Sequence, residues 1–243
     1  MNITALVFDF DGTLAELNID FAAMRVAAEA LARGLGFAGP WPGGYLLEQV
    51  DEVAAALGNG FRARAQGLIM EAEMEAARRG RLFGFSRELL SQARARGYCL
   101  AVISRNCGPA IRQVFPQVDQ MCDVFLPREA VARTKPDPAH PLAALARLGV
   151  PPARAAMIGD HPMDVTTALA AGCLAVGVAS GRVGPEELKA AGAGLVLPDA
   201  SGLLEALAVR VSPPGRGQGL SSSRSQGPSS PHLPSPQTPR PAS

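Results

Sequence analysis

The sequence predicts an α/β protein, in which helices flank a parallel β-sheet and a helical insertion follows the first strand. Three observations predict this class. Short apolar runs of strand length alternate with amphipathic helical stretches from residue 5 to about residue 197, a pattern typical of parallel sheets. One segment, 15–84, interrupts the alternation with helical patterns alone. The hydrophobic content of 47% is ample for a globular core.

Six short apolar runs are the predicted strands, because their length and their β-branched or aromatic content suit buried strands. In chain order they are ALVFDF, YCLAVIS, VFLPR, AAMIGD, LAVGVA and GLVLP. Apolar residues at helical spacing predict four helices between or after these strands, at 87–96, 138–148, 163–171 and 185–191. The active site of such a sheet lies beyond the carboxyl ends of its strands.

The segment 15–84 follows the first strand and reads as helices only, at 20–34, 46–57 and 61–79. GFAGPWPGGY and GNG separate these helices, and no stretch between them has the pattern of a strand. We therefore expect a small helical cap, 15–84, over the carboxyl edge of a core formed by 1–14 and 85–211.

The last segment, 212–243, has a different composition from the rest of the chain. Ser, Pro, Gly and Gln dominate it, and Leu220 and Leu233 are its large apolar residues. Such a segment cannot bury enough surface to offset the entropy of ordering it. We expect a disordered, dispensable tail, with peptide recognition through PHLPSPQTP as the alternative.

Charge and cysteine content exclude several classes of partner. The chain has 23 Lys and Arg against 22 Asp and Glu, a balance that gives no sign of nucleic-acid or anionic-membrane binding. No run approaches the roughly 20 apolar residues that a membrane span needs. Four scattered cysteines without a CxxC pair, and no signal peptide, favour a reducing cytoplasmic location. The sequence leaves a monomer and a homodimer equally open.

Two carboxylates stand at the end of the first predicted strand, in FDFDGTL. Strand periodicity places Asp9 and Asp11 on the same side. An Asp-Gly hairpin turn is the structural alternative and requires a second strand after Gly12, but TLAELNIDFAAMRVAA has a helical pattern. Two aligned carboxylates at a strand end favour a divalent cation, which offsets the cost of their charge.

Three other segments at or after strand ends contribute polar residues. VISRN contains Ser104 at the end of its strand, TKPDP places Lys135 before two rigid prolines, and GDHPMD carries Asp160 and Asp164. Each has an ordinary alternative: a helix-capping serine, a solvated lysine, or an acid favoured by a helix dipole. Together they predict one site at the carboxyl edge of the sheet.

The chain carries, in order, four segments that resemble the four motifs of the haloacid dehalogenase-like hydrolase superfamily: FDFDGTL, VISRN, TKPDP and GDHPMD. The helical insertion after the first motif resembles the branch typified by phosphoglycolate phosphatase. The resemblance spans residues 5 to about 207. It implies a Rossmann-like, three-layer core and a Mg²⁺-dependent phosphatase acting on a small phosphorylated metabolite, either phosphoglycolate-like or a sugar phosphate.

The resemblance assigns catalytic roles to four residues. Asp9 would be the nucleophile that forms an aspartyl-phosphate, and Asp11 the general acid and then the base. Ser104 and Lys135 would hold the phosphoryl oxygens as charge develops on them.

Two ligand sets follow from the same resemblance. The metal ligands would be Asp9, the backbone carbonyl of Asp11, and Asp160, with Asp164 acting indirectly or through water. The substrate phosphate would contact Asp9, Gly12, Ser104, Arg105 and Lys135. His161 is interpreted as a neighbour of the site and not as a ligand.

Two other functions remain open at this point. A phosphomutase similar to β-phosphoglucomutase would use the same core residues, and a catalytically idle scaffold could retain the fold. The cap residues that face the substrate cannot be assigned by motif. The candidates are Arg25, Trp41, Tyr45, Arg62 and Arg64.

Overall fold

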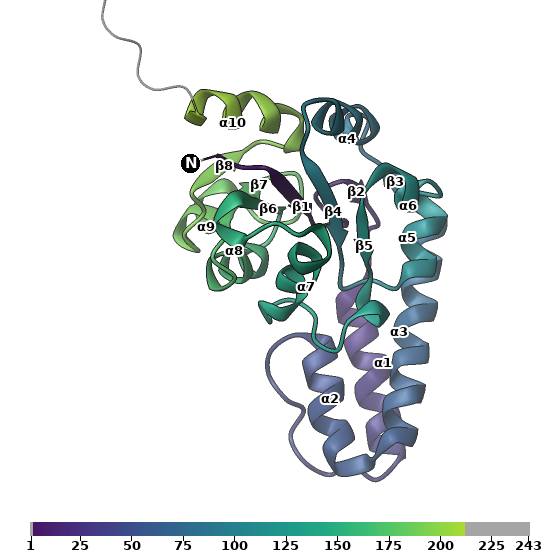
Figure 1. Ribbon diagram of the computed structural model, residues 1–243. Helices are drawn as coiled ribbons and strands as arrows, with labels where there is room; N and C mark the ends of the chain where they lie inside the picture. The colour runs from purple at the N-terminus through teal and green to yellow at the C-terminus, as the bar shows by residue number, and fades with distance from the viewer. Residues whose placement is uncertain (1, 212–243) are drawn as a thin grey trace, which may run out of the picture. The chain divides into compact units, whose positions relative to one another are not determined.

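The computed structural model describes residues 2–211, in which a six-stranded parallel sheet forms the core (Figure 1). The strand order is β5-β4-β1-β6-β7-β8. The strands are β1 (Ala5–Phe8), β4 (Cys99–Ile103), β5 (Val124–Leu126), β6 (Ala155–Gly159), β7 (Leu174–Val178) and β8 (Leu195–Leu197). All six predicted strands are confirmed, and so is the α/β class.

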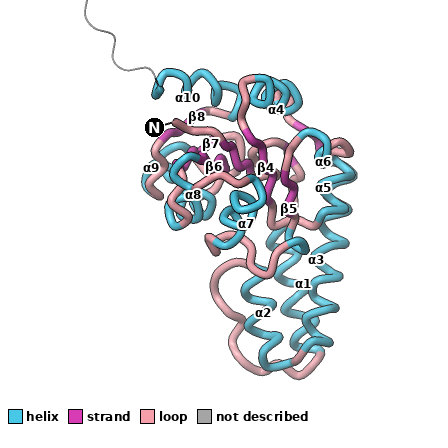
Figure 2. Tube along the Cα trace, viewed as in Figure 1, coloured by secondary structure: helices cyan, strands magenta, loops and turns pink. Residues whose placement is uncertain are grey.

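Helices cover both faces of the sheet, as the cyan segments around the magenta strands show (Figure 2). They are α4 (Ser86–Ala95), α5 (Gly108–Val114), α6 (Val118–Met121), α7 (Ala139–Leu148), α8 (Pro162–Ala170), α9 (Pro185–Ala190) and α10 (Leu203–Val211). Three 3₁₀ turns lie at Arg128–Ala130, Pro152–Arg154 and Ala200–Gly202. The four predicted core helices are confirmed to within two residues. The sequence patterns did not predict α5, α6 and α10.

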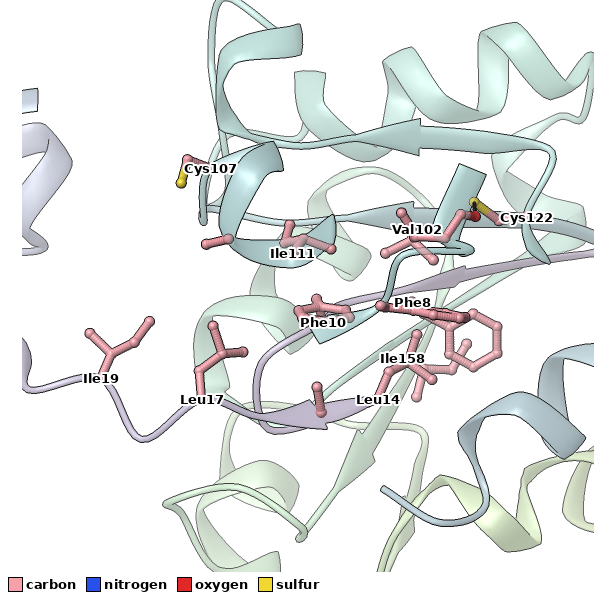
Figure 3. Packing of buried hydrophobic residues seen from close by; sticks show 14 of the residues in the cluster. Phe8, Phe10, Leu14, Leu17, Ile19, Val102, Cys107, Ile111, Cys122 and Ile158 are labelled. Atoms are coloured by element: carbon pink, nitrogen blue, oxygen red, sulfur yellow. Dashed lines mark hydrogen bonds between the residues drawn. The ribbon is translucent and has the colours of Figure 1, made fainter. Parts of the chain in front are cut away.

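Alternating side chains of the central strand β1 supply the two halves of the core. Leu6 and Phe8 pack with residues of α4, α5 and α10, whereas Ala5 and Val7 pack with residues of α7, α8 and α9. The register sets Phe8 beside Val102 of β4 and Ile158 of β6, and Figure 3 shows these side chains in one layer. Because β1 is buried on both faces, its carboxyl end is held firmly between its neighbours.

The three helices of the insertion are α1 (Phe21–Gly34), α2 (Leu46–Leu57) and α3 (Asn59–Arg79). They confirm the predicted helical insertion, and α3 starts two residues before its predicted start. Asp20 caps α1 by accepting a hydrogen bond from the Ala23 N–H at 2.9 Å. Buried residues of all three helices join the same apolar cluster as Phe8, and α3 packs against α5 of the core.

The expectation that 15–84 contains no strand is wrong. The two-residue strands β2 (Ala15–Glu16) and β3 (Arg81–Leu82) pair antiparallel, Ala15 with Leu82 and Glu16 with Arg81. Strands this short show no period in the sequence, and their pairing depends on segments far apart in the chain. They join the two ends of the insertion, so the chain leaves and re-enters the core at one place. β2 does not fold back on β1, and the Asp-Gly turn is therefore not a hairpin of the core sheet.

Residues 1–211 group into one compact unit, and the boundary between cap and core stays a prediction. The predicted tail, 212–243, lies outside the described residues. Within residues 2–211, no helix combines the length and the apolar character that crossing a bilayer requires.

Candidate active site

Residues from separate strand ends meet at the carboxyl edge of the sheet. Asp9 directly follows β1, Asp160 follows β6, and Asp164 lies in the first turn of α8. Carboxylate oxygens of these three acids all lie within 4.8 Å of one another. The ammonium of Lys135, from the loop between β5 and α7, lies 2.7 Å from Oδ1 of Asp9 and 2.6 Å from Oδ1 of Asp164. The structure thus brings together four of the predicted site residues.

Lys135 is only 2% exposed and is held through its backbone as well as its side chain. Its N–H donates to Nδ1 of His140 at 3.3 Å, which leaves Nε2 of the same ring to donate to the Leu126 carbonyl at 3.1 Å. The Lys135–Pro136 peptide bond is cis. The sequence reasoning did not identify His140, although a histidine in TKPDPAH is a polar residue where the chain starts an apolar helix.

Asp164 and His161 begin α8 as a reciprocal pair. Oδ2 of Asp164 accepts from the His161 N–H at 3.2 Å, and Nδ1 of His161 accepts from the Met163 N–H at 3.0 Å. The Asp164 carboxylate therefore uses one oxygen on the backbone and the other on Lys135. His161 acts as a helix cap next to the acids.

Neighbouring positive charge offsets the negative charges of Asp9 and Asp160 only in part. Burial raises the pKa of Asp9, and Lys135 opposes this shift. Burial, reinforced by Asp164 and Asp9, raises the pKa of Asp160 as well. Burial alone would lower the pKa of Lys135, but Asp164 and Asp9 outweigh it and raise the pKa.

Two of the three clustered carboxylates thus pair with the one ammonium, and the ion pairs within residues 2–211 include none to the third, Asp160. A divalent cation with a preference for oxygen ligands would relieve this excess of negative charge. The donor set fits Mg²⁺.

Glycine at three positions lets other segments approach the acids closely. A Cβ at Gly12 or Gly181 would overlap the Asp160 carboxylate, and one at Gly159 would overlap Asp164. Gly12 also has a φ of +82°, which favours glycine. The Gly12 N–H donates to the Ala15 carbonyl at 2.7 Å, so this donor already has a partner. The predicted contact of Gly12 with the substrate phosphate stays a prediction.

The Asp11 carboxylate is tied to the backbone at the start of the insertion. Its Oδ1 accepts a hydrogen bond from the Leu17 N–H at 2.8 Å, at the start of the insertion. Burial raises the pKa of the Asp11 carboxyl, opposed by the Leu17 N–H and by Arg182. A carboxyl that keeps its proton to higher pH and lies outside the cluster of three acids is suited to proton transfer.

Ser104 is buried at the end of β4 and shares two hydrogen bonds with Asn106. Its Oγ donates to Oδ1 of Asn106 and accepts from the Asn106 N–H, both at 3.1 Å. Glu73 of α3 supports this loop from the cap, because its carboxylate accepts from the Cys107 N–H at 2.9 Å and from Asn106 Nδ2 at 3.4 Å. Arg128 pairs with both oxygens of Glu73, at 2.6 and 3.1 Å.

The sequence reasoning missed Glu73, Asn106 and Arg128. A signal for Glu73 was present, since it lies four residues after Ile69 and three before Ala76, on the apolar face of its helix. A buried acid on such a face is uncommon unless it has a partner.

Arg105 links the cap to the backbone of Lys135. Its guanidinium forms two hydrogen bonds of 2.7 Å to the Glu48 carboxylate and another to the Lys135 carbonyl, and it lies over the Tyr45 ring at 5.3 Å. The predicted contact of Arg105 with substrate phosphate stays a prediction.

Of the five cap candidates, Tyr45 lies next to core loops of the site: Arg105 is over its ring and His161 meets its edge, with 6.0 Å between ring centroids. Within the cap, Trp41 Nε1 donates to Gln49 at 3.0 Å and Arg62 pairs with Asp51 at 3.0 Å. The remaining two candidates are exposed: Arg25 and Arg64.

Comparisons with known proteins agree with this geometry. The family model for haloacid dehalogenase-like hydrolases matches residues 3–172. N-acetylmuramic acid 6-phosphate phosphatase of Pseudomonas aeruginosa is 27% identical over 206 residues, 77% of this chain and 86% of that protein. A phosphoglycolate phosphatase of Neisseria meningitidis is 30% identical over 199 residues, 74% of this chain and 82% of that protein. The crystal structure of CbbY from Rhodobacter sphaeroides in complex with phosphate has a TM-score of 0.60 and 25% identity, and covers 83% of this chain and 96% of that one.

Proposed function

The chain belongs to the haloacid dehalogenase-like hydrolase family, and we propose that it is a Mg²⁺-dependent phosphatase that hydrolyses a small phosphate monoester through an aspartyl-phosphate at Asp9. Its family and its relatives named phosphatases make it a phosphoric monoester hydrolase. The observation that carries the mechanism is the contact of Lys135 with Asp9 and Asp164, beside Asp160.

In the first step, a carboxylate oxygen of Asp9 attacks phosphorus and the bond from phosphorus to the ester oxygen breaks. Lys135 already holds Oδ1 of Asp9 at 2.7 Å, which orients the nucleophile and leaves its second oxygen for the attack. Asp11 gives a proton to the departing alkoxide, so the alcohol leaves neutral. The raised pKa of Asp11 supports this role.

In the second step, water attacks the phosphorus of the aspartyl-phosphate. Asp11, now a carboxylate, accepts the proton of this water. The acyl-phosphate bond breaks, inorganic phosphate leaves, and Asp9 is restored. Ser104 and Lys135 hold the phosphoryl oxygens in both steps as their charge redistributes.

The metal ligands that we propose are Asp9, the backbone carbonyl of Asp11, and Asp160, with Asp164 acting indirectly or through water. Bound Mg²⁺ would supply positive charge between the carboxylates and the phosphoryl group, which otherwise repel each other. Oδ1 of Asp11 is occupied by the Leu17 N–H, which supports a proton-transfer role for this side chain and not a ligand role.

In the domain arrangement that we propose, the segment 15–84 forms a cap over the core of 1–14 and 85–211. Contacts of Tyr45, Glu48 and Glu73 with the core loops support it. A cap of this kind excludes water while phosphoryl transfer takes place.

The test is phosphate release from 4-nitrophenyl phosphate and a panel of phosphate monoesters, with Mg²⁺ and with EDTA. We expect turnover that EDTA abolishes, and a loss of at least about 10³-fold in kcat for Asp9→Asn, because the nucleophile is gone. The matched control is Asp51→Asn, the same change at an exposed site on α2. Undiminished turnover in EDTA would rule out the metal, and Asp9→Asn with a tenth or more of the activity would rule out the nucleophile. A strict requirement for a sugar bisphosphate would indicate a mutase.

A further inference from the structure

Four residues form a wall where the cap meets the loops of the site, which we call the cap wall: Tyr45, Glu48, Arg105 and His161. Tyr45 precedes α2 and Glu48 lies in its first turn. Arg105 directly follows Ser104, and His161 directly follows Asp160. Two residues of the cap wall are therefore sequence neighbours of Ser104, a proposed phosphate ligand, and of Asp160, a proposed metal ligand.

The aromatic ring of Tyr45 joins the two core loops. The Arg105 guanidinium carbon lies 5.3 Å from its centroid, and the His161 ring meets it edge-on at 6.0 Å. Tyr45 is 38% exposed, so one part of the ring is packed and another is open. An aromatic face with a hydroxyl group offers apolar contact and one polar handle.

The charge of Arg105 is cancelled within the cap wall. Both oxygens of Glu48 accept hydrogen bonds of 2.7 Å from its two terminal nitrogens, a bidentate arrangement. The Arg105 side chain is 17% exposed and that of Glu48 is 44% exposed. Because the arginine is the more enclosed partner, its charge is directed into this pair, and Glu48 keeps contact with solvent.

The other cations on the loops after β5 and β7 also have partners in the described residues. They pair as follows: Arg128 with Glu73, Arg133 with Asp137, Lys135 with Asp9 and Asp164, and Arg182 with the carbonyl of Ile19 and the ring of Phe21. A carboxylate on the leaving group would therefore enter a region of acids in which these cations are already engaged.

We propose that the cap wall selects substrates whose leaving group is uncharged and bears hydroxyl groups, and discriminates against those with a carboxylate next to the ester oxygen. This inference rests on the proposed phosphatase function and deepens it. Hydroxyl groups can bond to the Tyr45 hydroxyl and to the partly exposed Glu48 carboxylate, whereas a carboxylate is repelled by the acids of the site and finds the charge of Arg105 already neutralised.

Two near-isosteric substrates test the selection, 2-phosphoglycolate and 2-hydroxyethyl phosphate, which differ in a carboxylate against a hydroxymethyl group. We expect kcat/KM for 2-hydroxyethyl phosphate to exceed that for 2-phosphoglycolate by at least about tenfold. Hydrolysis of 4-nitrophenyl phosphate with Mg²⁺ reports on the catalytic core separately.

Glu48→Gln removes the negative charge and keeps the shape, so it leaves Arg105 with an unneutralised charge. The preference should shift toward 2-phosphoglycolate by about tenfold. Glu52→Gln makes the same change at an exposed position one turn later on α2 and should leave the ratio unchanged. Arg105→Met leaves Glu48 unpaired and should strengthen discrimination against 2-phosphoglycolate, which keeps the test valid if Glu48→Gln folds poorly.

Four results would overturn the inference. One is a wild-type preference for 2-phosphoglycolate. Another is an equal effect of both variants on both substrates, which would make Arg105 a ligand of the phosphate that the substrates share. Absence of turnover of every substrate, 4-nitrophenyl phosphate included, would overturn the proposed function and this inference with it. Turnover of 4-nitrophenyl phosphate with no change of the ratio would overturn the selection alone.

Discussion

At the scale of single residues, the position of Lys135 depends on a buried histidine as well as on two carboxylates. His140 is completely buried, accepts from the Lys135 N–H and donates to the carbonyl of Leu126. Both ring nitrogens are used in the neutral form, and protonation of Nδ1 would abolish the bond to Lys135. Burial and the charge of Lys135 lower the pKa of His140 to about 4.

This lowered pKa makes stability depend on pH in a definite direction. The unfolded chain has a histidine pKa of about 6.5, so between about pH 6.5 and pH 4 the unfolded state binds more protons than the folded one. The contribution of His140 is therefore complete above about pH 6.5 and is lost as the pH falls toward 4.

We predict that His140→Gln removes this loss, because glutamine can still accept and donate but does not titrate. Urea unfolding at pH 7 and at about pH 4.5 measures it. The wild type should lose roughly 2 kcal/mol more of its unfolding free energy between these values than the variant does. Equal losses in both proteins would show that His140 does not titrate in this way.

The meeting of Asp9, Asp160 and Lys135 could be predicted from the sequence, whereas the residues that support them could not. Asp9, Asp160 and Lys135 belong to short motifs at or after strand ends, so strand prediction and residue type placed them at one edge. His140 and Asn106 act through partners that tertiary structure provides. No spacing in the sequence indicates that Asn106 would meet Ser104 and Glu73 together.

At the scale of elements, helix α3 supports the core loop that follows β4. Its Glu73 side chain is 3% exposed, pairs with Arg128, and accepts from the backbone of Cys107 in the loop that follows Ser104. The loop therefore has part of its hydrogen-bonding framework in the cap. A buried pair of this kind is costly to break, because the remaining charge is left without a partner.

We predict that Glu73→Gln lowers the free energy of unfolding by roughly 3 kcal/mol, measured by urea unfolding at neutral pH. The control lies on the same helix: Glu75 is exposed and pairs with Arg78 and Arg79. Glu75→Gln should change stability by no more than about 0.5 kcal/mol. If both variants lost the same small amount, the Glu73–Arg128 pair would contribute no more than a surface pair.

Secondary-structure prediction succeeded for long elements, in which the hydrophobic period repeats several times, and failed for short ones. The cap helix α2 was predicted over its full extent, since twelve residues show an amphipathic pattern clearly. The two-residue strands β2 and β3 carry no such pattern, and α6 has only four residues. These short elements form because the neighbouring structure brings their backbones together.

At the scale of the whole molecule, the strand order explains why distant motifs form one site. β1 lies between β4 and β6, so the ends that carry Asp9, Ser104 and Asp160 are neighbours. Alternation of strands and helices predicted the parallel sheet, and the common edge followed from it. The contacts of Glu48 and Glu73 with the loops after β4 and β5 depend on how segments far apart in the chain pack together, which one-dimensional patterns do not encode.

The central claim is that Asp9 becomes phosphorylated during turnover. The most direct test is rapid acid quenching of the enzyme during hydrolysis of 2-hydroxyethyl phosphate with Mg²⁺, followed by peptide mass spectrometry. We predict a phosphoryl group on the peptide that contains Asp9, with fragmentation that assigns it to this residue, and none in Asp9→Asn or in EDTA. A phosphoryl group on another residue, or rapid turnover with an Asp9 peptide that stays unmodified at every quench time, would contradict the account.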